Sequence, residues 1–235
     1  MTTVVPIKGD IVTNDYGWFY DLLGDDYASP KSVSSVINQA NGDDLDIQIN
    51  SGGGLVTAGV EIYTMLKSYT GTVNVNVVGV AYSAASLIAM AGDVVAMSPA
   101  AMMMIHNVSG GGAGDYHDMA NISEELEKSN QAVANAYADK TGMSQDEILQ
   151  LMDSTYWLDP QTAIDKGFAD KMMFADADNK APEPALAMTA SLNQLPTKAL
   201  MDKFRQFVTP EQSADTQMLN TQIRLLKMKG EITHE

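Results

Sequence analysis

The chain has 235 residues, enough for one full hydrophobic core and a smaller appended segment, and 45% of them are hydrophobic, which predicts a packed globular protein. Cysteine is absent, which excludes disulfides, thiol chemistry and cysteine-based metal sites and fits the reducing cytoplasm that we expect as its location. The formal net charge is −16, and residues 1–174 carry 22 acidic and 7 basic side chains, so we expect no binding to nucleic acid or anionic lipid. We also expect no secretory signal at Met1 and no membrane span, because no run of 18 apolar residues occurs.

The first part of the sequence alternates apolar strands with amphipathic helices. Ser29 precedes Pro30, a typical N-cap followed by proline at the first helical position, so a helix is predicted to begin there. The repeated strand–helix–strand order predicts an α/β fold with parallel strands and right-handed crossovers. The other elements predicted in this part are strands at residues 4–12, 45–49 and 72–78 and a helix at residues 56–69.

Residues 77–107 hold the strongest candidate for a functional site. A strand is predicted to end at Gly79, and residues 82–91 are almost all small or apolar, which predicts a helix buried on all sides. Ser83 lies where the strand gives way to this helix, close to unpaired N–H groups that favour negative charge, a setting that suits a nucleophile whose product is an oxyanion. Taken alone, Ser83 is more typical of an N-cap. Ser86, one turn later, is interpreted as a small residue that permits close packing.

Two other stretches accompany Ser83. His106 follows the apolar residues 102–105, and the intervening chain is long enough to return it to the same edge of the sheet, although a lone histidine after such a run is more often a core residue. Residues 50–54, with the sequence NSGGG, follow a strand and precede a helix. Their glycines can bring backbone N–H groups close to a substrate oxygen, whereas the simpler interpretation is an ordinary turn.

The second half of the chain predicts a loop, a long helix and a separate tail. Residues 109–114, with the sequence SGGGAG, are typical of a flexible loop. Residues 115–140 carry apolar side chains at spacings of three, four and seven, which predicts a long helix that packs through one narrow stripe, on another helix or on its own domain. Ser144, three residues before a glutamate, begins the next helix with a capping box. Residues 175–197 predict a linker, and residues 198–235 predict a short helical tail that must dock on another surface.

Three motifs occur in a fixed order along the chain: Asn50-Ser51-Gly52-Gly53-Gly54, Gly79-Val80-Ala81-Tyr82-Ser83 and Met104-Ile105-His106. Together they resemble the proteolytic subunit of the Clp protease, the ClpP family of serine peptidases, over roughly residues 5–174. The resemblance implies a ClpP/crotonase-like β-β-α spiral, an α/β fold, for a protease domain at residues 1–174. The tail would then be a helical C-terminal extension.

The same resemblance implies roles for individual residues. Ser83 would be the nucleophile and His106 its general base, while the N–H groups of Gly54 and Ala84 would form the oxyanion hole. The long helix would be the handle helix through which two rings of subunits meet. Substrate is expected to lie extended beside glycine-rich backbone, and the expected substrate-binding residues are Gly53, Gly110, Gly111 and Gly112.

The acidic member of the family's catalytic triad has no direct counterpart here. Aligning Trp157 with an aromatic residue of the family places Thr155 at the acid's position, where a hydroxyl would hold the imidazole N–H without supplying a charge. Asp153 is the competing candidate, since it lies on the same side as Thr155 if this piece of chain is extended. Asp153 is equally typical of a surface acid.

We expect a serine endopeptidase that needs no metal or other cofactor, acts on polypeptides and assembles into a ring, or a double ring, of identical subunits. The departures from the family pattern resemble ClpP-like proteases encoded in phage head-assembly gene clusters. This predicts a head-maturation protease in the host cytoplasm or prohead interior that cleaves capsid or scaffold proteins and docks on them through its tail. Three alternatives stay open: a general peptidase subunit fed by an ATP-driven unfoldase, a crotonase-like acyl-CoA enzyme, and a non-catalytic scaffold.

Overall fold

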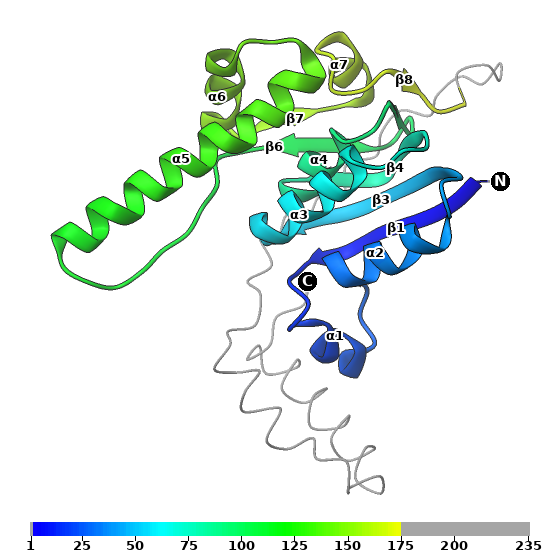
Figure 1. Cartoon of the computed structure of the whole chain (residues 1–235). Coiled ribbons are helices and arrows are strands. Elements are labelled where there is room, and N and C mark those ends of the chain that lie inside the picture. Colours follow the sequence, from blue (N-terminus) through cyan, green and yellow to red (C-terminus); the bar gives the residue numbers. More distant parts are fainter. Residues whose placement is uncertain (1, 175–235) are drawn as a thin grey trace, which may run out of the picture.

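The structure of the protein is a computed structural model that describes residues 2–174 (Figure 1). The predicted linker and helical tail, residues 175–235, lie outside the described residues. The strands and helices of the described part follow in this order: β1 Thr2–Ile11, α1 Gly17–Leu23, β2 Tyr27–Ala28, α2 Pro30–Gln39, β3 Asp44–Gly54, α3 Val56–Lys67, β4 Val73–Tyr82, α4 Ala84–Ala89, β5 Val94–Met97, β6 Met102–Ile105, α5 Tyr116–Thr141, α6 Gln145–Asp153, β7 Tyr156–Leu158, α7 Pro160–Asp165 and β8 Lys171–Met172.

The strands form one sheet whose main path is β2-β1-β3-β4-β5-β8, and every pair along this path is parallel. On the edge away from β3, β4 pairs with two strands, because residues 74–77 pair with β5 whereas residues 80–82 pair with β6. The short strand β7 pairs antiparallel with β6. The predicted α/β fold with a parallel sheet is therefore confirmed, and the division of β4 brings the end of β6 beside the end of β4.

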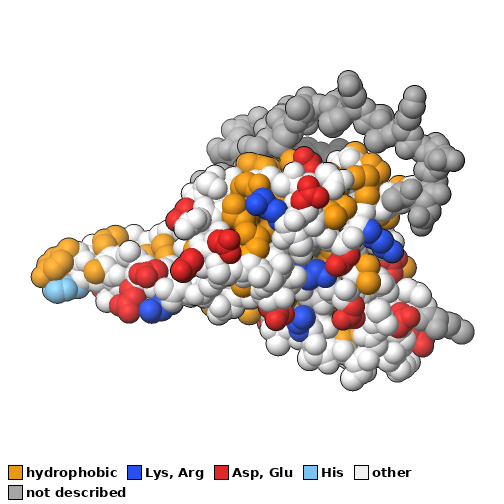
Figure 2. All heavy atoms as spheres, turned by 90° about the horizontal axis from the view of Figure 1, so that it is seen from above, with side chains coloured by type: hydrophobic (Ala, Val, Ile, Leu, Met, Phe, Trp, Pro, Cys, Tyr) orange, Lys and Arg blue, Asp and Glu red, His pale blue; other side chains and the backbone are white. Residues whose placement is uncertain are grey.

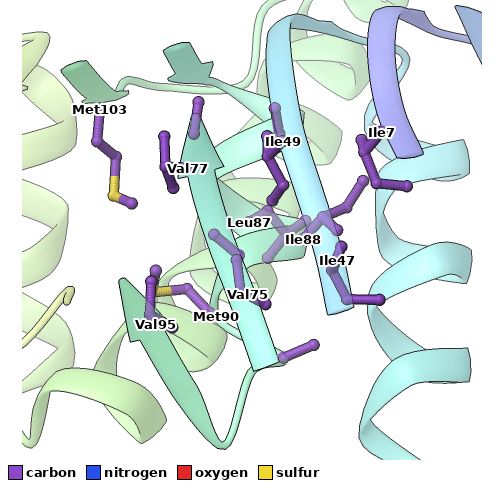
Figure 3. Packing of buried hydrophobic residues seen from close by; sticks show 14 of the residues in the cluster. Ile7, Ile47, Ile49, Val75, Val77, Leu87, Ile88, Met90, Val95 and Met103 are labelled. Atoms are coloured by element: carbon purple, nitrogen blue, oxygen red, sulfur yellow. The ribbon is translucent and has the colours of Figure 1, made fainter. Parts of the chain in front are cut away.

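The hydrophobic core lies between the central strands and α4. Ile49 of β3 and Val75 of β4 pack with Leu87 and Ile88 of α4, and all four side chains are buried (Figure 3). Full burial of an aliphatic side chain of this size stabilises the fold by about 1.5–3 kcal/mol. Every residue of α4 is buried, which confirms the prediction of a helix covered on all sides and fixes the residues at its N-terminus against the sheet.

Two central strands are longer than predicted, and both extensions reach the candidate site. β3 continues through the glycine-rich segment to Gly54, and β4 continues past Gly79, so the prediction that Gly79 ends the strand is wrong. Asn50 explains the continuation, since its side-chain oxygen accepts a hydrogen bond of 3.1 Å from the Val80 N–H. A β-carbon at Gly79 would collide with this side chain, so glycine leaves room for Asn50 at the point where the β3–β4 pairing shifts register, from Ile49–Val77 to Ser51–Ala81.

The predicted long helix is α5. Asp115 caps its N-terminus in a capping box with Asp118, and Gly142 ends it in the left-handed conformation with a φ of 73°. The C-terminal half of α5 docks on the body through Val133 and Tyr137, whereas the N-terminal half projects away from the body and carries acidic side chains along one side (Figures 1 and 2). No helix within residues 2–174 is long and apolar enough to cross a membrane.

Candidate active site

The turn between β4 and α4 holds Ser83 in an unusual backbone conformation, with φ 54° and ψ −123°. A positive φ is uncommon outside glycine and costs of order 1–3 kcal/mol, so the surrounding structure must impose it. The Ser83 N–H donates a 2.8 Å hydrogen bond to the Met104 carbonyl, and the Ser83 carbonyl accepts one of 3.2 Å from the Leu87 N–H. Ser83 is thus the N-cap residue of α4 by position, but its hydroxyl makes no capping hydrogen bond to the helix.

His106 follows directly after β6 and lies beside this turn. Its Nε2 atom is 2.8 Å from Ser83 Oγ, a hydrogen-bonding distance. The pairing of Tyr82 with Met104 in adjacent strands explains the contact, since each side chain lies just beyond the end of its strand. Burial lowers the pKa of the partly buried imidazole below its ordinary value, which favours the neutral form that can accept a proton. His106 is therefore only partly buried and bonded to Ser83, so it is not a core histidine.

The glycine-rich end of β3 packs against the Ser83 turn. Ser51 is buried and fixes this segment, because its hydroxyl donates to the Gly9 carbonyl at 2.6 Å and accepts from the Gly53 N–H at 3.1 Å. Gly53 has a φ of 99°, and a β-carbon there would lie 2.8 Å from the β-carbon of Ser83. Only glycine satisfies both the backbone conformation and the close approach, so Gly53 serves the packing of the turn.

A small cavity of about 70 Å³ opens beside the Ser83–His106 pair. Gly54 and Ala84, the two expected donors of the oxyanion hole, both line it. Ala84 is the first residue of α4, where a backbone N–H has no partner within the helix. Apolar side chains complete much of the wall, namely those of Val56, Leu87, Val108 and Val133. The cavity thus combines a hydroxyl–imidazole pair with backbone N–H groups and an apolar wall.

Neither candidate for the third member of a triad contacts the imidazole. Asp153 is the last residue of α6, so the segment is not extended there, and its carboxylate accepts a 2.7 Å hydrogen bond from the Asn107 side chain. Thr155 has a φ of 51°, an uncommon conformation for a β-branched residue. Among residues 2–174, no hydrogen bond joins either side chain to His106. The identity of the third member stays a prediction.

The expected substrate-binding glycines Gly110, Gly111 and Gly112 lie in an exposed segment that forms no strand. This segment runs beside the projecting half of α5, because a β-carbon at Gly112 would lie 2.6 Å from the Ile122 side chain, and one at Gly110 would lie 3.4 Å from that of Leu126. The structure therefore places Gly110 and Gly112 against α5, whereas a β-carbon at Gly111 would meet open space. Their role in substrate binding stays a prediction.

Three further polar residues at the site make hydrogen bonds that were not predicted from the sequence. Ser51 was visible as part of a motif, but its bond to the distant Gly9 depends on strand pairing. Ser86 was interpreted as a packing residue, whereas its hydroxyl oxygen lies 2.7 Å from the Ser83 carbonyl oxygen and 3.0 Å from that of Met104. Tyr137 was assigned to the apolar stripe of α5, yet its hydroxyl lies 2.8 Å from Ser86 Oγ. Within residues 2–174, no group of three or more His, Asp or Glu side chains is placed to hold a metal ion.

Comparisons with known proteins agree with this geometry. The family model described as Clp protease matches residues 33–176. An ATP-dependent Clp protease proteolytic subunit from Pleurastrum terricola is 33% identical over 156 residues, which cover 63% of this chain and 80% of the relative. A protein of the same name from Bacteroides fragilis is 33% identical over 134 residues, which cover 56% of this chain and 65% of the relative.

The solved structures include a mutant of ClpP1 from Listeria monocytogenes that is similar to this chain. The two share 26% sequence identity and superpose with a TM-score of 0.59, over 73% of this chain and 91% of the other. This likeness confirms the ClpP-like α/β fold expected for residues 1–174. The family match spans more than half of the sequence, and the chain belongs to the Clp protease family.

Proposed function

We propose that this chain is a serine endopeptidase in which Ser83 is the nucleophile and His106 the general base. The observation that carries the proposal is the 2.8 Å hydrogen bond between His106 Nε2 and Ser83 Oγ, beside a cavity lined by two candidate oxyanion donors. A hydroxyl bonded to a neutral imidazole is the arrangement that activates a serine. The same pair favours a peptidase over the crotonase-like alternative, whose chemistry would not need it.

In the proposed reaction, Ser83 Oγ attacks the carbonyl carbon of a peptide bond while His106 Nε2 takes the hydroxyl proton. The resulting oxyanion accepts hydrogen bonds from the Gly54 and Ala84 N–H groups, each worth about 3–4 kcal/mol in such sites. His106 then delivers the proton to the leaving amine, and water, deprotonated by the same imidazole, releases the acyl group from Ser83. Accepting the proton at Nε2 requires the hydrogen of the neutral ring to be on Nδ1.

Two biological roles are compatible with this chemistry. The relatives named as proteolytic subunits of an ATP-dependent protease support a general peptidase subunit that an unfoldase supplies with polypeptides. Head maturation in a phage, with docking on capsid or scaffold proteins through residues 198–235, rests on the departures from the family pattern, such as Thr155 at the position of the triad acid, and on the predicted tail. Both roles use the same chemistry and, we propose, a ring of identical subunits.

Replacing the nucleophile tests the chemistry directly. Ser83→Ala removes the attacking oxygen, so we expect hydrolysis of a short fluorogenic peptide to fall by at least about a thousandfold, with the oligomer unchanged in size-exclusion chromatography. Ser35→Ala, an exposed serine in α2, is the matched control and should keep wild-type activity. Near-wild-type hydrolysis by Ser83→Ala would remove Ser83 from the mechanism.

The third member of the site is tested with two near-isosteric variants, Thr155→Val and Asp153→Asn. Neither side chain forms a hydrogen bond with the imidazole in the structure, so we expect each variant to keep kcat/KM within about tenfold of wild type, as a Ser–His dyad would. Steady-state kinetics on the same peptide provides the measurement. A loss approaching about 10⁴-fold in one variant, the effect of removing a triad carboxylate, would instead identify that residue as the third member.

The dependence of kcat/KM on pH reports the protonation of His106. The neutral imidazole is the active form, and burial lowers its pKa, so activity should persist as the pH falls and decline only below the 6.5 of an ordinary histidine. A profile from about pH 5 to about pH 8 measures the acid limb. A limb with its midpoint above 6.5 would contradict the assignment, since it would require a charged partner that stabilises the imidazolium.

The two biological roles differ in their need for ATP. A general subunit should degrade a stably folded protein only when a Clp-type unfoldase and ATP are added. A head-maturation protease should cleave a co-expressed scaffold or capsid protein without any need for the unfoldase. Ser83→Ala is the inactive control for both assays. Gel electrophoresis of the products distinguishes these outcomes, and cleavage in neither assay would count against both roles.

A further inference from the structure

A group of buried polar atoms lies directly beneath the Ser83 turn. The Ser86 hydroxyl is fully buried and lies 2.7 Å from the Ser83 carbonyl oxygen, 3.0 Å from the Met104 carbonyl oxygen and 2.8 Å from the Tyr137 hydroxyl. Tyr137 belongs to α5 and is also buried, with an exposed fraction of 2%. Buried hydroxyls are retained where their hydrogen bonds are satisfied, so the direction of each bond can be worked out.

Counting hydrogens assigns the donors. The two carbonyl oxygens can only accept, and Ser86 has one hydrogen to give. If Ser86 donates to a carbonyl, Tyr137 donates to Ser86 Oγ, and all the hydroxyl hydrogens are used. If Ser86 donated its hydrogen to Tyr137 instead, no hydrogen would remain for its contacts with the Ser83 and Met104 carbonyl oxygens. Burial raises the pKa of Tyr137, and its bond to Ser86 opposes this only in part, so the phenol stays protonated and able to donate.

The Ser83 carbonyl belongs to the same peptide unit as the Ala84 N–H. A trans peptide unit is planar, so its C=O and N–H bonds point in opposite directions. The hydrogen bonds from Ser86 and from the Leu87 N–H hold the carbonyl on one side, and they therefore direct the Ala84 N–H to the other side. The cavity beside Ser83 is lined by Ala84, one of the two expected oxyanion donors.

We infer that Tyr137 is a positioning residue for the oxyanion hole, acting through Ser86 on the peptide unit between Ser83 and Ala84. The inference rests on the proposed peptidase function and adds a residue from α5 to it. Tyr137 links the docked half of α5 to the reaction, since its hydroxyl stabilises the orientation of a donor that is needed most when the oxyanion forms. The effect belongs to the transition state and not to substrate binding.

The test removes single hydroxyls and separates kcat from KM. Tyr137→Phe should lower kcat on a short fluorogenic peptide about tenfold with KM within about twofold, because the bond is important mainly in the transition state. Ser86→Ala should give a similar loss, and the double variant Ser86→Ala/Tyr137→Phe should lose little more than either single variant, since both break one chain of bonds. The affinity for a peptide aldehyde, whose adduct with serine mimics the oxyanion, should fall by the same factor as kcat/KM.

A matched control distinguishes positioning from stability. Tyr20→Phe also removes a buried phenol hydroxyl and its 2.6 Å hydrogen bond to Asp10. Tyr20 lies in α1, in a separate apolar cluster with Val12 and Phe19. Tyr20→Phe should keep wild-type kcat even if its thermal stability falls. Wild-type kcat in Tyr137→Phe, or equal losses of kcat in Tyr20→Phe, would overturn the inference. If Tyr137→Phe does not fold, Ser86→Ala decides in the same way.

The inference and the proposed function fail differently. An active Ser83→Ala variant would refute the peptidase mechanism itself. An inactive Ser83→Ala variant together with a fully active Tyr137→Phe variant would refute only the role of Tyr137. A rise in KM as large as the loss of kcat would also overturn it, because positioning of an oxyanion donor leaves binding of the uncharged ground-state peptide nearly unchanged.

Discussion

The strained backbone of Ser83 is the constraint on which the rest of the site depends. A positive φ at a serine persists only where its neighbours impose it, and here both of its polar groups are held, the N–H by Met104 and the carbonyl by Leu87 and Ser86. This conformation turns the chain abruptly from β4 into α4 and directs the hydroxyl toward His106 instead of the helix N-terminus. The usual capping bond of a serine is given up for a bond to an imidazole.

Each large feature of the fold contributes to this one turn. The division of β4 between β5 and β6 places the strand before His106 next to the strand before Ser83. The glycines at the end of β3 let this strand approach the turn closely, and the Ser51 hydroxyl holds them through the Gly53 N–H. The burial of α4 on all sides prevents the turn from relaxing, because any shift of the helix would open voids in a closely packed core.

Local signals in the sequence predicted much of this arrangement. Ser29-Pro30 and Ser144 begin helices as their capping patterns indicate, α4 is buried as its composition predicts, and the motifs identified Ser83 and His106 as residues that would meet. These predictions depend on short-range physical chemistry or on a fixed order of motifs. They succeed because capping, periodicity and glycine conformations are determined by residues near in sequence.

The remaining features depend on residues far apart in sequence. The continuation of β4 past Gly79 requires the Asn50 side chain, and the hydrogen bonds of Ser86 require Tyr137, 51 residues later. α1 has no side-chain cap at its N-terminus and so lacked a starting signal. Asp153 would have faced the same side as Thr155 only in an extended segment, whereas α6 continues through Asp153. Its carboxylate accepts a hydrogen bond from Asn107, a contact between a helix end and a loop that no local pattern indicates.

The most direct test of the account is to find which serine reacts with a fluorophosphonate. A reactive phosphonate labels only a serine whose hydroxyl is activated by a base, and the structure provides such a pair at Ser83 and His106. Mass spectrometry of the digested, labelled protein should place the adduct on Ser83 alone, and His106→Ala should abolish the labelling. Labelling of a different serine, or of none in a folded and assembled protein, would contradict the central claim.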